Sequence, residues 1–188
     1  MEIFDIIKRR RTIRSFTDKP IEKEKLDIMI EGARLAPSGA NLQPIKYIVV
    51  NSKEYCDKLF PLTKWAGYTA PLGVPTTKDA PTAYIIVLID EDIRKDGNND
   101  AAYAGENIVL LAESMGIGSC IIGSVDREET VKVFDIPENL KIHTVIALGY
   151  PNQKSSVFDM EDSVKYYLDE NKDFHVPKRK KEDITKYY

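Results

Sequence analysis

The chain contains little cysteine and histidine, two residue types that often bind metals or act in catalysis. It has 188 residues, of which only two are cysteine and two are histidine. Cys56 and Cys120 lie far apart and match no metal-ligand or redox spacing, and we expect no disulfide in a reducing cytosol. His143 falls inside an expected strand and His175 in the polar C-terminal part, where neither predicts a ligand. The sequence therefore offers no convincing catalytic triad or metal site.

Long apolar runs and a large excess of one charge are also missing. No segment approaches the ~20 apolar residues that a membrane-spanning helix needs. Asp5 and Lys8 interrupt the apolar N-terminal segment, unlike in a signal peptide. The chain has 27 Lys and Arg against 30 Asp and Glu, and this net charge of −3 argues against a general nucleic-acid binder. We therefore expect a cytoplasmic protein with no membrane partner and no nucleic-acid partner.

The hydrophobic pattern predicts a single domain, residues 1–188, in which helices cover a central sheet. A chain of this length, 43% hydrophobic, is long enough for one sizeable core and too short for two comfortable ones. The alternation of helical periods with β-branched runs predicts an α/β sandwich. We expect helices at 21–36, 52–62, 100–115 and 126–134, and strands at 47–50, 83–89, 119–122 and 141–148. No glycine-rich turn follows the first strand, which argues against a dinucleotide-binding fold or a P-loop.

Two long segments show no clear period. Residues 64–81 are expected to form a loop, in which Trp65 and Tyr68 act either as a lid over a site or as anchors. Residues 151–188 are polar and are either disordered or wrapped around a partner subunit. Their many aromatic residues favour wrapping, because an exchanged tail builds a large interface in a homodimer.

A basic cluster follows the first short apolar segment. Residues 8–16 read KRRRTIRSF, and guanidinium groups match the oxygens of a phosphate. In an extended backbone the side chains of Arg10, Thr12 and Arg14 would point the same way. The cluster is therefore a candidate phosphate clamp. A solvated face and a docking site for an acidic partner remain open as alternatives.

Four motifs follow one another along the chain. They are RRTIRSF at 10–16, APSGANLQP at 36–44, GIGSCIIG at 116–123 and VIALGYP at 145–151. In this order they resemble the nitroreductase family of flavin enzymes, and the basic residues 178–180 look like that family's last cofactor-contacting segment. The resemblance implies an α+β fold, a three-layer α/β/α sandwich with a mostly antiparallel sheet. It also implies that the C-terminal tail, residues 151–188, is exchanged in a homodimer.

The resemblance further implies an enzyme. Members of the family hold FMN between the subunits of a homodimer, take hydride from NADH or NADPH, and reduce small molecules such as nitroaromatics, quinones or flavins. The alternatives are a flavin-binding sensor or carrier without turnover, and a relative that performs reductive dehalogenation or flavin cleavage. The cofactor-binding residues implied here are Arg10, Arg11, Thr12, Arg14, Pro37, Ser38, Gly39, Asn41, Ile122, Gly123, Ser124, Lys178 and Arg179.

These residues have different implied roles. Residues 10–12 would contact the FMN phosphate and ribityl chain, and Arg14 would lie at the pyrimidine end of the flavin. Residues 37–41 would come from the partner subunit. The backbone N–H of Gly123 would donate toward N5 of the flavin, and Arg179 or a neighbouring lysine would complete the phosphate clamp. No residue of the chain is implied as a catalytic base or nucleophile, because the flavin performs the redox chemistry.

Overall fold

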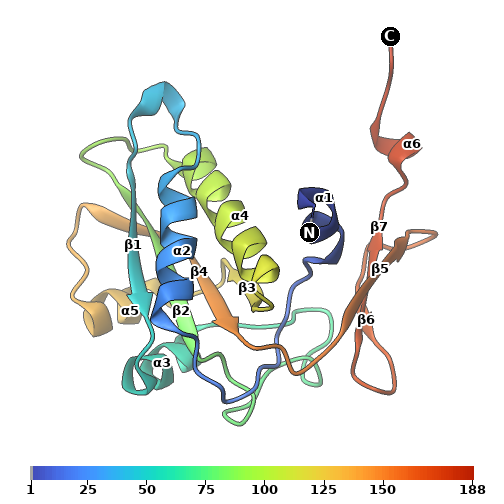
Figure 1. Ribbon diagram of the computed structural model, residues 1–188. Helices are drawn as coiled ribbons and strands as arrows, with labels where there is room; N and C mark the ends of the chain where they lie inside the picture. The colour runs from blue at the N-terminus through green and yellow to red at the C-terminus, as the bar shows by residue number, and fades with distance from the viewer. Residues whose placement is uncertain (1) are drawn as a thin grey trace.

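The centre of the protein is a four-stranded antiparallel sheet. The computed structural model describes residues 2–188. The strands are β1 (Ile45–Val50), β2 (Ala83–Asp90), β3 (Gly118–Ile122) and β4 (Leu140–Gly149). Their order is β1-β2-β4-β3, so β2 and β4 lie in the middle and β3 lies at an edge (Figure 1). The antiparallel sheet expected from the family resemblance is confirmed.

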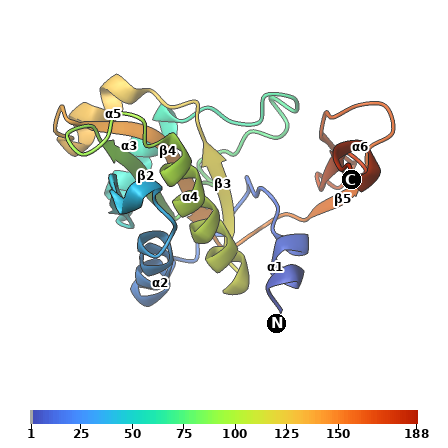
Figure 2. The ribbon, with the colours of Figure 1, turned by 90° about the horizontal axis from the view of Figure 1, so that it is seen from above.

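Helices cover both faces of this sheet. The helices α2 (Lys23–Arg34) and α4 (Asn98–Ser114) lie on one face, and α3 (Lys53–Leu59) and α5 (Arg127–Phe134) lie on the other (Figure 2). Alternate residues of β2 enter the two cores: Ile85 packs with the α2 and α4 residues, and Ile86 with the α3 residues. Because both of its faces are buried, β2 is an uninterrupted apolar run in the sequence.

The N-terminal segment lies against the β3 edge of the sheet. After α1 (Ile3–Arg9) the chain runs extended, and Thr12 pairs in parallel with Ser119. This approach requires a glycine in the neighbouring strand, since a Cβ on Gly149 would lie 2.7 Å from the ring of Phe16. Phe16 in turn is 1% exposed, so its packing fixes the path of the whole segment.

Residues 151–188 form a second, small sheet beside the body. Its strands are β5 (Ser155–Asp159), β6 (Tyr167–Leu168) and β7 (Phe174–Lys178), in the order β5-β7-β6. β5 runs parallel to β7, and β6 runs antiparallel to it. After β7 come a short helix, α6 (Lys181–Ile184), and a C-terminus that points away from the body (Figure 1). Strands therefore replace the disorder that the composition left open, while Tyr187 and Tyr188 remain 79% and 106% exposed.

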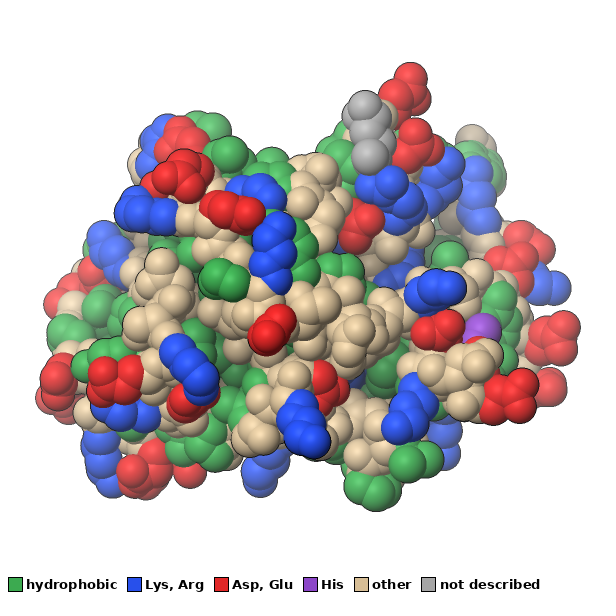
Figure 3. Space-filling model, turned by 60° about the horizontal axis from the view of Figure 1, so that its bottom comes forward, with side chains coloured by type: hydrophobic (Ala, Val, Ile, Leu, Met, Phe, Trp, Pro, Cys, Tyr) green, Lys and Arg blue, Asp and Glu red, His purple; other side chains and the backbone are tan. Residues whose placement is uncertain are grey.

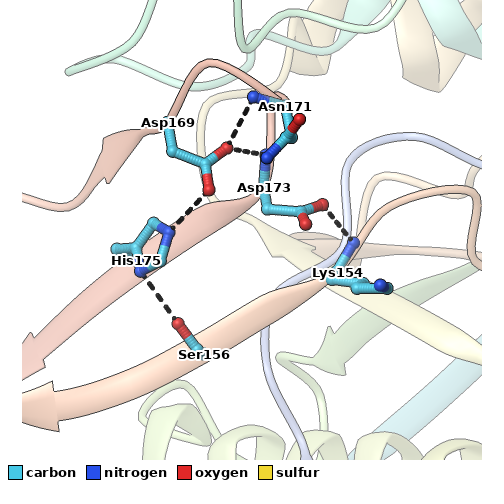
Figure 4. A network of polar contacts seen from close by, with 6 residues as sticks. All are labelled: Lys154, Ser156, Asp169, Asn171, Asp173 and His175. Atoms are coloured by element: carbon cyan, nitrogen blue, oxygen red, sulfur yellow. Dashed lines mark hydrogen bonds and ion pairs between the residues drawn. The ribbon is translucent and has the colours of Figure 1, made fainter.

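A polar network joins the strands of this C-terminal sheet (Figure 4). His175 lies with one ring nitrogen 3.0 Å from the Ser156 hydroxyl and the other 3.0 Å from the Asp169 carboxylate. The same carboxylate accepts hydrogen bonds from the backbone N–H groups of Asn171 and Asp173, both at 2.9 Å. The contact with His175, followed by the Asp173 N–H, lowers the pKa of Asp169. These polar contacts thus hold together a sheet that has little apolar core.

Substitution of Tyr84 tests the second core, which lies between the sheet and α3. Tyr84 is 0% exposed, and its hydroxyl has no hydrogen-bond partner among residues 2–188. Burial raises the pKa of this phenol, so the group stays neutral. Tyr84→Phe removes an unpaired buried polar group, and we expect the free energy of unfolding to rise by about 1 kcal/mol. Urea unfolding measures the change.

The matched control is the same substitution at Tyr150. The Tyr150 hydroxyl donates to Glu22 at 2.6 Å and accepts from Lys25 at 2.7 Å, so Tyr150→Phe should lower stability. A loss of stability in Tyr84→Phe as well would contradict the assignment of an unpaired hydroxyl.

Candidate cofactor-binding site

The basic cluster lies at the edge strand β3. α1 ends at Arg9, with Arg10 as its C-cap, and the N–H of Ile13 donates to the carbonyl of Ser119 at 2.9 Å. This contact brings residues 10–14 beside the strand that leads to Ile122, Gly123 and Ser124. Two segments more than 100 positions apart in the sequence, residues 12–13 and Ser119, therefore lie side by side at the edge of the sheet.

Arg11 holds α1 and leaves one donor free. Its Nη2 donates to the carbonyls of Ile7, at 3.1 Å, and Lys8, at 2.7 Å, which are acceptors left unpaired at the end of a helix. Its Nε is buried with no partner within residues 2–188. Burial, together with the neighbouring Arg10, lowers the pKa of Arg11. A buried donor of this kind requires an acceptor, which an anionic ligand can supply.

The cluster retains a positive excess. Arg9 pairs with Glu113 near the end of α4, with 3.3 Å between Nε and Oε1. Burial raises the pKa of Glu113, and the charges of Arg9, Arg10 and Arg11 oppose that rise. The Arg10 guanidinium makes no ion pair or side-chain hydrogen bond in the described part of the chain. One carboxylate thus faces three guanidinium groups, a balance that favours binding of an anion.

Arg14 connects the cluster to the C-terminal sheet. Its guanidinium lies 4.8 Å from the ring centre of Tyr166 and 4.9 Å from that of Phe174, in cation–π geometry. Its backbone N–H donates to Gln153 Oε1 at 3.1 Å. Beside Arg14 is an open cavity of about 470 Å³, lined by residues 72–76 of the long loop and 171–174 of the tail. The tail therefore forms one wall of the space next to this arginine.

The long loop, residues 64–81, contains Trp65 and Tyr68, for which the sequence left open a role as a lid or as an anchor. Trp65 packs on the second core, and its Nε1 donates to Thr63 at 2.9 Å, so this side chain is an anchor. Tyr68 is 59% exposed and packs on Tyr166 with 5.1 Å between the ring centres. Tyr68 thus contacts the tail through Tyr166, the ring that lies beside Arg14.

The turn after β3 presents an unused backbone donor. The carbonyl of Gly123 accepts from Arg127 Nη2 at 3.1 Å, and that of Ser124 accepts from the N–H of Lys64 at 3.0 Å. The N–H of Gly123 has no acceptor within residues 2–188. A Cβ on Gly123 would meet nothing within 4 Å, so the space beside it is open. A planar group can approach this backbone closely.

Arg127 was not among the residues indicated by the sequence. Its Nε donates to the carbonyl of Ile142 and its Nη2 to that of His143, both at 3.1 Å, which ties the turn to β4. Burial, with Arg127 as the second cause, lowers the pKa of His143. The sequence signal is slight: Arg127 is one basic residue in the first turn of a helix capped by Asp126.

The loop with Pro37, Ser38, Gly39 and Asn41 lies on the opposite side of α4 from α1 (Figures 1 and 2). Ser38 donates to Asp100 in the first turn of α4, whereas Arg9 pairs with Glu113 near its last turn. An α-helix rises 1.5 Å per residue, so the two ends of this helix are about 25 Å apart. One chain therefore places residues 10–14 beside β3, the strand that leads to residues 122–124, but leaves 37–41 remote.

Lys178 and Arg179 are exposed at the end of β7. The Lys178 carbonyl accepts from the N–H of Met160 at 2.7 Å. Neither side chain is bonded to the N-terminal arginines within the described residues. On the face drawn in Figure 3, acidic and basic side chains are interspersed, with no broad patch of one sign.

Neither a membrane-spanning helix nor a metal-binding cluster is found among residues 2–188. No helix there combines the length and the apolar character needed to cross a membrane. In the same part of the chain, no three or more His, Cys, Asp or Glu side chains are grouped so as to hold a metal ion.

Comparison with known proteins gives concordant matches. The model of the nitroreductase family matches residues 7–150. A Methanothermobacter thermautotrophicus protein, provisionally named NADH dehydrogenase/NAD(P)H nitroreductase, is 32% identical over 176 residues, which cover 90% of this chain and 87% of that protein. A crystal structure from Clostridium acetobutylicum, provisionally named NADH oxidase, is 33% identical with a TM-score of 0.69 and covers 97% of this chain and 100% of that one. An FMN-dependent nitroreductase from Clostridium difficile R20291 is 27% identical with a TM-score of 0.71, covering 85% of this chain and 94% of that one.

Proposed function

The chain belongs to the nitroreductase family, and on that premise we propose that the edge of β3 is an FMN site of an NAD(P)H-dependent oxidoreductase. The observation that carries the proposal is the set of donors left unpaired there: the Arg10 guanidinium, the buried Nε of Arg11 and the N–H of Gly123. When bound, FMN supplies the redox chemistry between NADH or NADPH and a small electrophile such as a nitroaromatic, a quinone or a flavin.

The residues of the chain bind and orient this cofactor. Arg10 and Arg11 neutralise the phosphate, and the Thr12 hydroxyl completes its hydrogen bonds. Arg14 places a positive charge at the edge of the ring, where reduction develops negative charge.

The ring would lie on the turn formed by Ile122, Gly123 and Ser124, and the Gly123 N–H would donate to it. Lys178 and Arg179 add cations from the tail.

The active unit in this proposal is a homodimer with FMN between the subunits. The site of one chain lacks residues 37–41, which contact α4 about 20 Å away from Glu113 and can reach only the site of a second copy. α1 also exposes an apolar face, with Ile3 at 63% and Phe4 at 64% exposure, as an interface does. Residues 1–188 form one domain, in which 151–188 wrap the partner and bury Tyr187 and Tyr188.

The proposal includes a cytoplasmic location and no partner among nucleic acids or membranes. Cys56 and Cys120 are both unpaired and buried, which fits a reducing compartment. The net charge of −3 gives no electrostatic attraction for nucleic acid.

The visible absorption spectrum of the purified protein tests the proposed function. We expect a flavin spectrum that bleaches when NADH or NADPH is added without oxygen and returns when an acceptor such as a quinone is added. A flavin spectrum that persists would indicate a flavin-binding module without turnover. Absence of flavin after reconstitution with FMN would contradict the proposal.

Arg10→Ala tests the phosphate clamp. Loss of a charge-assisted hydrogen bond should raise the Kd for FMN by on the order of 10- to 100-fold. Titration of the apoprotein with FMN, followed by flavin fluorescence, measures the change. Lys8→Ala is the matched control, since the Lys8 side chain is 56% exposed and contacts Asp5 and Phe4 within α1 itself. An unchanged Kd in Arg10→Ala would remove Arg10 from the site.

A chain ending at Lys172 tests the role of the tail. This truncation removes β7, the middle strand of the C-terminal sheet, and with it Lys178 and Arg179. We expect weaker dimerisation in analytical ultracentrifugation and a lower FMN content. A chain ending at Lys180 keeps β7, Lys178 and Arg179 but lacks Tyr187 and Tyr188, so comparison of the two chains separates the contribution of β7 from that of the last residues. If the shorter chain stays dimeric and yellow, the tail does not hold the partner.

A further inference from the structure

The loop after α2 has an unusual backbone. Ala40, Asn41 and Gln43 have φ values of 52°, 56° and 54°, in the left-handed region that residues with a side chain rarely adopt. Such a conformation costs free energy and persists only where the surroundings hold it in place. Three of these residues within four positions indicate a loop whose shape is imposed on it.

Asp100 is the group that imposes this shape. It is 4% exposed and lies in the first turn of α4, where the helix dipole favours a carboxylate. Its Oδ2 accepts from the Ser38 hydroxyl at 2.5 Å and its Oδ1 from the N–H of Gly39 at 3.2 Å. The Ser38 oxygen in turn accepts from the N–H of Gln43 at 2.8 Å, which closes the loop on itself.

These bonds determine which polar groups of the loop remain for a ligand. The Ser38 hydroxyl hydrogen and the Gly39 N–H are both given to Asp100. A Cβ on Gly39 would overlap the guanidinium of Arg94, so that side of the loop is also covered. The side-chain amide of Asn41 has no partner within residues 2–188, and Asn41 is exposed. Asn41 is therefore the outward-facing group of the loop.

We propose that Asp100 is a positioning residue for the cofactor bound by the partner subunit, acting through the loop to present the Asn41 amide. Ser38 and Gly39 then serve as the scaffold of the loop, and Asn41 makes the contact. This inference rests on the proposed function, since it takes the ligand to be FMN. An amide suits that ligand because it both donates and accepts hydrogen bonds.

The test is the Kd for FMN of the full-length protein in a set of variants. We expect Asp100→Ala to raise the Kd by on the order of 10- to 100-fold, since the Ser38 hydroxyl and the Gly39 N–H lose the acceptor that holds the loop. Asp100→Asn should restore affinity to within about threefold of wild type, because the amide oxygen takes the Gly39 N–H and the Ser38 hydroxyl can rotate to accept. Asp92→Ala removes an exposed carboxylate from the segment before α4 and should leave the Kd unchanged.

A double-mutant cycle separates positioning from general destabilisation. If Asp100 acts through Asn41, the Asp100→Ala and Asn41→Ala effects on the Kd overlap, and the double variant binds FMN about as weakly as the weaker single variant. Additive effects, or a Kd of Asp100→Ala within twofold of wild type, would overturn the inference. Should Asp100→Ala not fold, Ser38→Ala removes the same bond and takes its place in the cycle. Wild-type protein that binds no FMN would refute the proposed function instead.

Discussion

The packing of residues 12–16 against the β3–β4 edge of the sheet is the contact on which the candidate site depends. Phe16 is almost fully buried because Gly149 leaves room for its ring, and Thr12 pairs with Ser119. These contacts place the segment that carries the arginines beside β3, the strand that leads to the turn at Gly123. Without them the chain would have a basic N-terminal segment of the ordinary solvated kind. The space that Gly149 leaves for the Phe16 ring therefore determines where the positive charges of the site lie.

The helices and strands of the body could be predicted because each satisfies a local rule. β2 is buried on both faces and reads as one apolar run. α4 ends at Ser114, with Met115 as its C-cap, before Gly116, whose φ is 72°. The C-terminal sheet could not be predicted in this way. β6 has two residues, and β5 pairs with β7 across an intervening segment, so its order comes from contacts between His175, Ser156 and Asp169.

The residues of the candidate site also divide into those that the sequence indicated and those that only the structure reveals. Residue type and motif order indicated the arginines, the 37–41 loop and the turn at Gly123, which remain predictions as contacts of FMN. The sequence did not indicate Asp100 or Arg127, because their importance lies in burial and in backbone groups from other elements. An aspartate in the first turn of a helix is ordinary, and only the structure reveals that its carboxylate is 4% exposed and carries a strained loop.

The two halves of the proposed site are prepared for a ligand in opposite ways. At the 38–43 loop the Ser38 hydroxyl and the N–H groups of Gly39 and Gln43 are already bonded and the loop conformation is set on folding, so binding to the Asn41 amide requires little further ordering there. At the β3 edge the reverse holds: Arg10 is unpaired and the Nε of Arg11 is buried without an acceptor, so the ligand-free chain retains repulsion and an unmet donor. An anion bound there relieves both the charge repulsion and the unmet donor. Its binding therefore also stabilises the N-terminal segment. If the same ligand also spans to the loop of a second chain, cofactor binding, dimerisation and folding of this edge become one coupled equilibrium.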